Sequence, residues 1–555
     1  MKREFLWVIY PLLVIISVRA LTLDMSKFNL VQFQDLDILS MLSLSSFAFI
    51  LLLATVLALT LIYGNRSEIR LATVMIFAVL CITYFLGQYP LLAYWDYYLH
   101  GATAKLVLSQ SIISSGDYRA YPMPFVLIAT TSLITSGGIL ESMQLLFYAS
   151  QVLCFIVIYI FTRRYEDERK RAVIVLLATY FVLSFSPDGG RHFSPAQYAF
   201  TLFLLFLSPL LTLPRITGTR MALALIFMLA IVMGHPITSV FVFGIICALV
   251  LFRRISIQTG LLILTVFLLW QVQVGYNWFG QSYAYFIQTF VLGKGSSALA
   301  AQAVPFRELL VYLSPQVLML TVFKWIAFGA IIIVGLAVAI RYRSDRYMGT
   351  ILTLFVGLVI GGVVLSVSPY AWIQRMVAPL ALVGVLAIGV TLKSTRKQSR
   401  SIILLAVLLM PVFISARPPY FIFSAHPHEY EEFVHEWETS VASFANSYGY
   451  TPSKGGKQII STDSITCYIY GFFDSHADLD TECLEAYSNF TSIGEVTPTV
   501  FDRGIVIRST RQELVSYSYA NIQPSFWHQV DMNLSDTYMR IYSNGYATVY
   551  VKYGP

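Results

Sequence analysis

The segment QYPLLAYWDYYLHGATAKLVLSQSIISSGDYRAYPMP, residues 88–124, separates two strongly apolar runs of the chain. It holds Asp96, His100, Asp117 and Arg119 among tyrosine and tryptophan rings. Asp96 and His100 are four residues apart, so a helix here would place both on one face. We therefore expect this segment to be a loop at a membrane surface that carries reacting groups.

The composition indicates a membrane protein. Of the 555 residues, 57% are hydrophobic and 12% are charged, whereas soluble domains are about 25% charged. The mean hydropathy is +0.69. The net charge of +7 lies mainly in short loops between apolar runs, which is the pattern of membrane orientation and argues against nucleic-acid binding. The first apolar run has no clear cleavage site, so we expect it to stay as a helix.

We predict an α-helical multi-pass membrane protein with about thirteen transmembrane helices, because runs of roughly 20 apolar residues can cross a bilayer. The expected spans are residues 5–23, 39–63, 71–87, 139–162, 172–187, 197–213, 220–234, 237–252, 257–274, 317–340, 348–367, 376–392 and 401–416. With these spans, the basic loops fall on one side, which the positive-inside rule makes cytoplasmic. The N-terminus is then cytoplasmic and the C-terminal region lies outside the cell membrane.

Residues 122–138, PMPFVLIATTSLITSGG, are apolar enough to resemble a further span. Counting them as a span would place RRYEDERKR, residues 163–171, outside and would reverse every later loop. We interpret them as a re-entrant or surface-lying helix, which is tolerated where protein shields its ends. The alternative is a true span at 122–138 followed by a run at 139–162 that does not cross fully.

Two domains are expected. Residues 1–416 form the transmembrane domain, with 88–138 as its first large outer loop, and residues 417–555 form a small α/β domain outside the membrane. The last part of the chain, MRIYSNGYATVYVKYGP, has Asn-Gly between two β-rich runs, which favours a hairpin. An oxidising exterior would allow Cys467 and Cys483 to pair, and the sequence leaves this open.

Asp96 and His100 are the candidate catalytic residues. A carboxylate such as Asp96 can take a proton from an attacking hydroxyl, and His100 would assist it from the same helix face. Asp96 is also a favoured residue for the start of a helix, so a capping role is the alternative. His100 could instead be one more interfacial ring.

Arg191, His192 and Arg375 are the candidate phosphate-binding residues. All three fall in outer connections next to predicted spans, where ionisable side chains are costly and often functional. The guanidinium fork matches the oxygens of a phosphate. For Arg375, a side chain that reaches out to lipid headgroups is the alternative.

His235, Asp117 and Asp188 are candidates for an acceptor or metal site. Histidine and carboxylate oxygens can together hold a divalent cation, although the sequence leaves any metal cofactor unknown. Asp188 lies in Pro-Asp-Gly-Gly, where an ordinary turn is the leading interpretation. His235 precedes a proline and could simply end a helix.

The order of these motifs resembles the GT-C superfamily of multi-pass glycosyltransferases. The matching motifs are WDYYLHGA at 95–102, SSGDY at 114–118, YPMPFVLI at 121–128, IFTRRYEDERKR at 160–171, GHPIT at 234–238 and IYSNGYATVY at 541–550. They are similar to those of protein mannosyltransferases, aminoarabinose transferases and uncharacterised archaeal members. Tyr97 stands where a second acidic residue often follows, more than one span precedes the loop where better-known enzymes have one, and no WWD motif is present.

The resemblance implies transfer of a sugar from a polyprenyl- or dolichyl-phosphate donor to an acceptor at the outer membrane face. It implies that Asp96 is the general base and that the acceptor is a lipid-linked glycan or a protein. Two alternatives remain: a flippase or transporter of lipid-linked saccharides, and a polymerase of them. The sugar, the acceptor and the oligomeric state are left open by the sequence.

Overall fold

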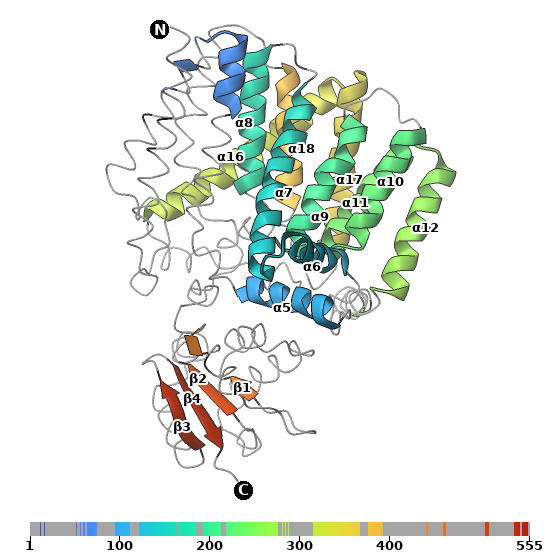
Figure 1. Cartoon of the computed structure of the whole chain (residues 1–555). Helices are drawn as coiled ribbons and strands as arrows, with labels where there is room; N and C mark the ends of the chain where they lie inside the picture. Colours follow the sequence, from blue (N-terminus) through green and yellow to red (C-terminus); the bar gives the residue numbers. More distant parts are fainter. Residues whose placement is uncertain are drawn as a thin grey trace. The chain divides into compact units, whose positions relative to one another are not determined.

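The computed structural model describes much of the helical part of the chain and a small sheet near its end (Figure 1). The described residues are 64–74, 95–110, 121–163, 165, 167–184, 193–211, 218–275, 315–366, 376–391, 459–461, 505–509, 538–543, 547–552 and isolated positions such as 440, 441 and 444. The chain divides into two compact units, one of Met1–Tyr89 with Leu145–Ala425 and one of Pro90–Gln144 with His426–Pro555. The domain boundary predicted at residue 416 stays a prediction.

The first unit contains most of the described helices. They are α7 (Ile139–Thr162, its first residues belonging to the second unit), α8 (Glu168–Ser184), α9 (Pro195–Leu211), α10 (Gly218–Val232), α11 (Pro236–Leu251), α12 (Ile257–Gln273), α16 (Pro315–Arg341), α17 (Arg346–Ser366) and α18 (Val377–Thr391). Three of them, α9, α11 and α16, begin with a proline. Proline is favoured at this position because its missing N–H would be unsatisfied there in any case.

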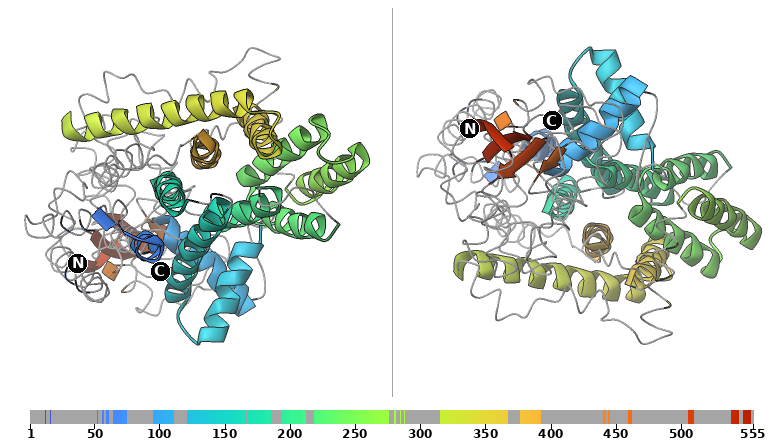
Figure 2. Two further views of the ribbon diagram at one scale, coloured as in Figure 1. Left: turned by 90° about the horizontal axis from the view of Figure 1, so that it is seen from above. Right: turned by 90° about the horizontal axis from the view of Figure 1, so that it is seen from below.

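Helices α11 and α17 form the centre of this unit. On one side α11 packs against α9, α10 and α12, and on the other side α17 packs against α16 and α18. Figure 2 shows α18 end-on, and it packs against both α16 and α8. Glycines permit the central contact, since a Cβ on Gly244 would lie 2.2 Å from the Gly357 carbonyl oxygen and 2.6 Å from the Gly361 nitrogen.

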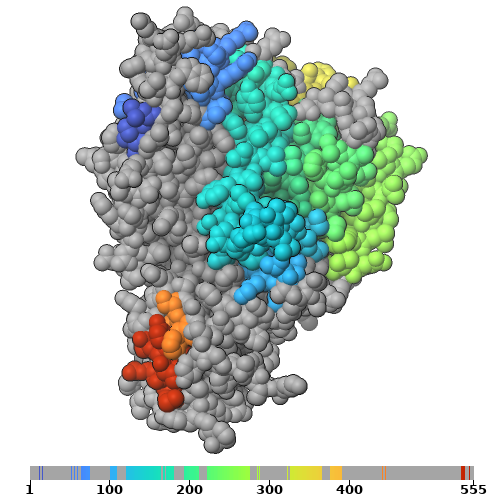
Figure 3. Space-filling model, in the orientation of Figure 1, coloured from blue at the N-terminus to red at the C-terminus, as the bar shows by residue number. Residues whose placement is uncertain are grey.

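The outward surfaces of these helices are apolar. Ile226 of α10 is 61% exposed, Leu262 of α12 is 66% exposed and Ile333 of α16 is 70% exposed. The side chains of α7 and α12 form part of the surface drawn in Figure 3. Exposed apolar surface on several neighbouring helices is unfavourable in water and indicates contact with lipid, which agrees with a membrane location.

Two described helices, Ile139–Thr162 and Arg346–Leu365, are long and apolar enough to cross a membrane. The other apolar helices of the described part are shorter, such as Pro236–Leu251 and Ile257–Gln273. The count of about thirteen spans therefore stays a prediction, whereas the helical membrane class agrees with the fold.

One end of the first unit carries its described basic side chains. We call this the basic end, and it includes the connections 163–167, 252–256 and 342–345. Its described basic residues are Arg66, Arg70, Arg163, Lys170, Arg171, Arg253, Arg254, Arg341, Arg343 and Arg346. Consecutive helices reverse direction, so α8, α10, α12 and α17 end at the other end, which we call the opposite end. The predicted gathering of basic loops on one side holds for the basic loops that the structure describes, and the assignment of that side to the cytoplasm stays a prediction.

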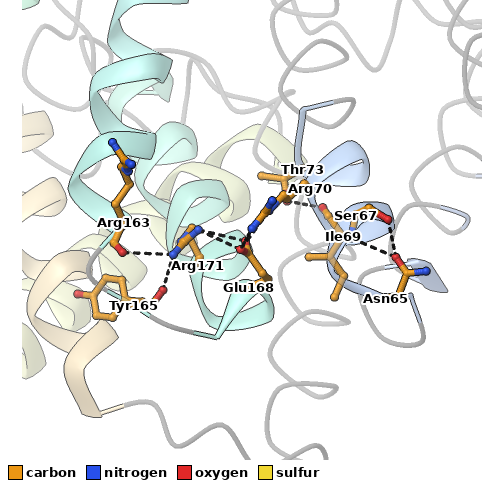
Figure 4. Close-up of polar contacts among 9 residues, drawn as sticks. All are labelled: Asn65, Ser67, Ile69, Arg70, Thr73, Arg163, Tyr165, Glu168 and Arg171. Carbon is orange, nitrogen blue, oxygen red and sulfur yellow. Dashed lines mark hydrogen bonds and ion pairs between the residues drawn. The ribbon is translucent and has the colours of Figure 1, made fainter.

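A charge cluster at the basic end joins the helical segment 66–74 to α8 (Figure 4). Arg70 donates two hydrogen bonds to Oε1 of Glu168, and Arg171 donates to both oxygens of the same carboxylate at 3.1 and 3.2 Å. The hydrogen bonds with Glu168 raise the pKa of Arg70. Arg171 also donates to the carbonyls of Arg163 and Tyr165 at 3.2 and 2.7 Å. The cluster therefore ties the start of α8 to the segment 66–74 and to the carbonyls that follow α7.

The same loop also contacts α18. The Tyr165 hydroxyl donates to the Leu386 carbonyl at 2.7 Å, and the Lys170 ammonium donates to the Val390 carbonyl at 3.3 Å while lying over the Tyr165 ring. A cation near the last carbonyls of a helix is favourable because those groups have no partner within the helix. The start of α8 and the residues just before it therefore contact both the segment 66–74 and α18, which are distant in sequence.

Replacing Glu168 by glutamine should lower the free energy of unfolding by about 1.5–3 kcal/mol, the usual contribution of hydrogen bonds to charged groups. Glu168 is 7% exposed, and the variant removes the carboxylate that two arginines share. Thermal unfolding in detergent measures the effect. Glu68→Gln is the control, because Glu68 is a carboxylate of the same end of the bundle, and its Oε2 accepts the N–H of the nearby Asn65 at 2.8 Å. Equal stabilities of the two variants would contradict the role of the cluster.

In the second unit, α5 (Trp95–Gln110) packs against α6 (Met123–Thr135). Helix α6 has 13 residues, about 20 Å at 1.5 Å per residue, which is short of the roughly 30 Å hydrocarbon core. It ends at Ser136, whose φ of 53° is left-handed, and α7 then runs unbroken over 24 residues. These lengths favour the non-spanning interpretation of residues 122–138.

The second unit also contains a four-stranded sheet in the order β1-β2-β4-β3. The strands are β1 (Ile459–Ser461), β2 (Ile505–Ser509), β3 (Tyr538–Ser543) and β4 (Ala547–Lys552). β1 and β2 are parallel, and β4 is antiparallel to both β2 and β3. The predicted pairing of the last two β-rich runs is confirmed. Phe444 stacks on Tyr542 of β3 with ring centroids 4.3 Å apart.

Candidate active site

Asp96 and His100 both belong to α5, as expected. Asp96 is the second residue of the helix, and its side chain lies outside the described part. His100 is 3% exposed, and its ring lies against Phe125 of α6 with the centroids 5.8 Å apart. The imidazole is therefore enclosed by the α5–α6 packing, whereas the sequence suggested an open surface. His100 is placed to hold α5, and with it Asp96, against α6.

His235 lies at the opposite end of the first unit and caps α11. Its backbone is extended, with φ −164° and ψ 130°, and its Nδ1 accepts the Thr238 N–H at 3.3 Å. The Thr238 hydroxyl lies 3.1 Å from the same nitrogen. Helix starts need such acceptors because their first N–H groups have no partner within the helix. The alternative from the sequence was that His235 ends a helix. In the structure α10 ends at Val232, and His235 caps the start of α11.

The cap also decides which ring nitrogen carries the proton. A backbone N–H can only donate, so Nδ1 of His235 must be the acceptor and cannot be protonated. A neutral imidazole then has its proton on Nε2, which makes Nε2 a donor without a free lone pair. With Nδ1 as the acceptor, Nε2 of His235 is suited to donate to an anion or hydroxyl.

Replacing His235 by leucine should lower the free energy of unfolding by about 1 kcal/mol, because loss of a helix cap costs roughly 0.5–2 kcal/mol. Asparagine is a preferred capping residue, so His235→Asn should retain most of that stability. The midpoint of thermal unfolding in detergent separates the two variants. If leucine and asparagine gave the same midpoint, the capping role would be wrong.

The start of α9 meets the turn that carries His235. Tyr198 lies so close to Gly234 that a Cβ there would be 2.5 Å from its ring, and the same ring packs edge-on against Phe193 at 6.2 Å. Phe193 and Tyr198 are 3% and 8% exposed. The segment that follows Arg191 and His192 is thus brought next to His235.

The remaining candidates lie outside the described residues. They are Asp117, Asp188, Arg191, His192 and Arg375. Two of their chain neighbours are described. Phe193 directly follows His192, and Met376, which directly follows Arg375, packs against Gly362 near the end of α17. Both neighbours belong to the opposite end, as His235 does.

Several buried polar residues of this end escaped the sequence reasoning. Ser194 caps α9 by accepting the Gln197 N–H at 3.1 Å, and Gln271 of α12 donates to the Ser239 hydroxyl of α11 at 3.3 Å. The one sequence signal is Ser-Pro-Ala-Gln at 194–197, which has the spacing of a capping box. Gln271 carries no such signal, because only helix packing brings it to Ser239.

No group of three or more His, Cys, Asp or Glu side chains that could hold a metal ion occurs among the described residues. The cofactor stays unknown.

Solved structures provide the comparison. ArnT from Cupriavidus metallidurans, in a crystal structure with bound undecaprenyl phosphate, matches 87% of this chain and 99% of its own length, with 13% identity and a TM-score of 0.50. Its apo structure matches equally. This chain has the ArnT fold. The GT-C-like membrane fold predicted from the motifs is thereby confirmed, at a sequence identity that establishes the fold and leaves the activity to be tested.

The archaeal oligosaccharyltransferase AglB from Archaeoglobus fulgidus, in complex with an inhibitory peptide and a dolichol-phosphate, has 12% identity over 83% of this chain and 70% of its own, with a TM-score of 0.48. No family model matches the sequence, and no curated protein matches it either.

Proposed function

We propose that this protein is an inverting glycosyltransferase that moves a sugar from a polyprenyl- or dolichyl-phosphate donor to an acceptor at the outer membrane face. The observation that carries the proposal is the ArnT-like fold, which spans 99% of ArnT. ArnT has been crystallised with undecaprenyl phosphate. We assign the same class of lipid to this chain.

Asp96 is the general base in this proposal. The acceptor hydroxyl oxygen bonds to the anomeric carbon of the sugar while the bond from that carbon to the phosphate oxygen breaks. The hydroxyl proton passes to the Asp96 carboxylate, and the bonding electrons leave with the lipid phosphate. His100, enclosed against Phe125, holds α5 in place and thereby positions Asp96.

The leaving phosphate gains negative charge, so its binding site should supply donors and positive charge. Arg191, His192 and Arg375 fill that role in our proposal, and His235 adds an Nε2–H donor. This assignment is supported by the chain neighbours of these residues. Phe193 and Met376 are described, and they lie near the starts of α9 and α18, at the same end of the first unit. The C-terminal region would position the acceptor, a lipid-linked glycan or a protein.

The experiment is incubation of the purified protein with polyprenyl-phosphate sugars that differ in the sugar, each with and without lipid-linked glycan and peptide acceptors. Release of free polyprenyl phosphate together with acceptor glycosylation supports the proposal. Repeating the assay with a chelator tests the metal requirement. A flippase would move the sugar lipid across vesicles without releasing phosphate, and a polymerase would lengthen a lipid-linked saccharide, so either outcome would replace the proposal.

A further inference from the structure

Two buried glutamine side chains in the first unit, Gln151 of α7 and Gln197 of α9, have groups without hydrogen-bond partners. Gln151 is 2% exposed and Gln197 is 1% exposed. Within the described part of the chain, neither the Gln151 Nε2 nor the Gln197 Oε1 has a hydrogen-bond partner. A buried polar group in this state costs roughly 1–3 kcal/mol, and in a membrane-embedded bundle polar side chains commonly mark a functional site.

The two amides lie at the same level of neighbouring helices. The Cys154 sulfur of α7 lies 3.7 Å from the Thr201 hydroxyl of α9, so the helices touch there. Gln151 is three residues before Cys154 and Gln197 is four residues before Thr201, so each lies one turn away on the same helix face. Both helices run toward the basic end, and both amides are therefore displaced toward the opposite end.

Gln197 has an alternative partner that it does not use. Ser194 and Gln197 have the spacing of a capping box, and the Ser194 hydroxyl does accept the Gln197 N–H at 3.1 Å. In a complete capping box the glutamine side chain would return the bond to the backbone N–H of the serine. The Gln197 Oε1 does not make that bond. Its side chain is directed elsewhere, although the local bond would have satisfied it.

The two groups have opposite hydrogen-bonding character, which restricts what can satisfy both. The Gln151 Nε2 needs an acceptor and the Gln197 Oε1 needs a donor. An ionised phosphate only accepts, and an ammonium only donates. A hydroxyl does both, because it can accept from Gln151 and donate to Gln197. The ligand class that fits is therefore a hydroxyl compound.

We propose that Gln151 and Gln197 bind a hydroxyl group of the sugar carried by the lipid donor, which makes them specificity residues. This inference rests on the proposed function. Gln197 lies in the first turn of α9, five residues after His192, so the sugar site would adjoin the phosphate-binding residues proposed above.

The test compares lipid binding with and without the sugar. Binding of mannosyl- and glucosyl-phosphodolichol and of dolichyl phosphate is measured for the wild type, Gln151→Leu and Gln197→Leu in detergent. Each variant should bind at least one of the sugar lipids about three- to tenfold more weakly, the effect of one hydrogen bond. Binding of dolichyl phosphate should not change. Thermal stability should be equal or higher, because the substitution removes a buried group without a partner.

Gln271→Leu is the matched control. Its amide already donates to Ser239, so this variant should lose stability and keep the wild-type preference between sugar lipid and bare lipid. Unchanged binding of both sugar lipids in both Gln151→Leu and Gln197→Leu would overturn the inference. A water molecule that bridges the two amides would then be the explanation of their burial. Equal weakening for dolichyl phosphate would overturn it as well. A wild-type protein that binds neither sugar lipid more tightly than dolichyl phosphate would overturn the proposed donor along with the sugar site.

Discussion

Asp96→Asn should reduce sugar transfer by about 10²–10⁴-fold, the usual effect of losing a general base, while the protein remains folded. Asparagine has nearly the same shape as aspartate and remains a favoured residue near a helix start. Asp96 is the second residue of α5, where loss of a negative charge costs only about 0.3–1 kcal/mol through the helix dipole. The effect on transfer is therefore far larger than the effect on stability.

The measurement is the rate of polyprenyl phosphate release by purified protein, with the unfolding midpoint recorded for each sample. Asp345→Asn is the matched control. Asp345 lies at the basic end, and its carboxylate accepts the N–H groups of Tyr347 and Met348 at the start of α17, both at 3.0 Å. Asparagine can keep that cap, so this variant should transfer sugar at the wild-type rate. Full activity of Asp96→Asn, or equal loss in both variants, would refute the assignment of the base.

Gly244→Leu should lower the free energy of unfolding by about 3 kcal/mol or more, at the upper range of overpacking effects. The first atom of any side chain at Gly244 would lie 2.2 Å from a backbone oxygen of α17. The converse contact is equally tight, since a Cβ on Gly357 would lie 2.5 Å from the Ile245 Cα. Backbone atoms cannot move aside as a flexible side chain can, so α11 and α17 would have to separate.

Helices in membranes associate through such close approaches because lipid offers no hydrophobic driving force between them. Gly357 and Gly361 have the Gly-x-x-x-Gly spacing on α17. Gly329→Leu is the control, because a Cβ at Gly329 of α16 would meet nothing within 4 Å. That variant should fold with unchanged or higher stability, since glycine costs about 1 kcal/mol relative to good helix formers. Similar unfolding midpoints for Gly244→Leu and Gly329→Leu would show that the α11–α17 contact tolerates separation.

Much of the fold could be predicted because its signals are local. Apolar runs of helical length and proline at helix starts are read along the chain, and so is the hairpin now seen as β3 and β4. The alternation of basic loops was equally informative. Loops such as 163–171 and 341–346 were expected on one side, and they lie at one end of the described helices.

The contacts of individual site residues could not be predicted from the sequence in the same way. His100 was expected to assist Asp96 from a surface loop, yet its ring is enclosed against Phe125 because α5 packs on α6. His235 was a candidate for an acceptor or metal site, and the structure adds that its Nδ1 caps α11 by accepting the Thr238 N–H. Such outcomes depend on side-chain rotation and on neighbours that no local pattern specifies.

By itself, then, the sequence determined the membrane class, the GT-C-like order of motifs and the separation of basic loops, because composition and periodicity report directly on solvent preference. Only the tertiary structure decided that Glu168 joins Arg70 to Arg171, that Gly244 meets Gly357, and that Gln151 and Gln197 lie at one level of adjacent helices. These pairs come from helices that are distant along the chain. Their meeting depends on how each helix is rotated and packed, which is a property of the whole bundle.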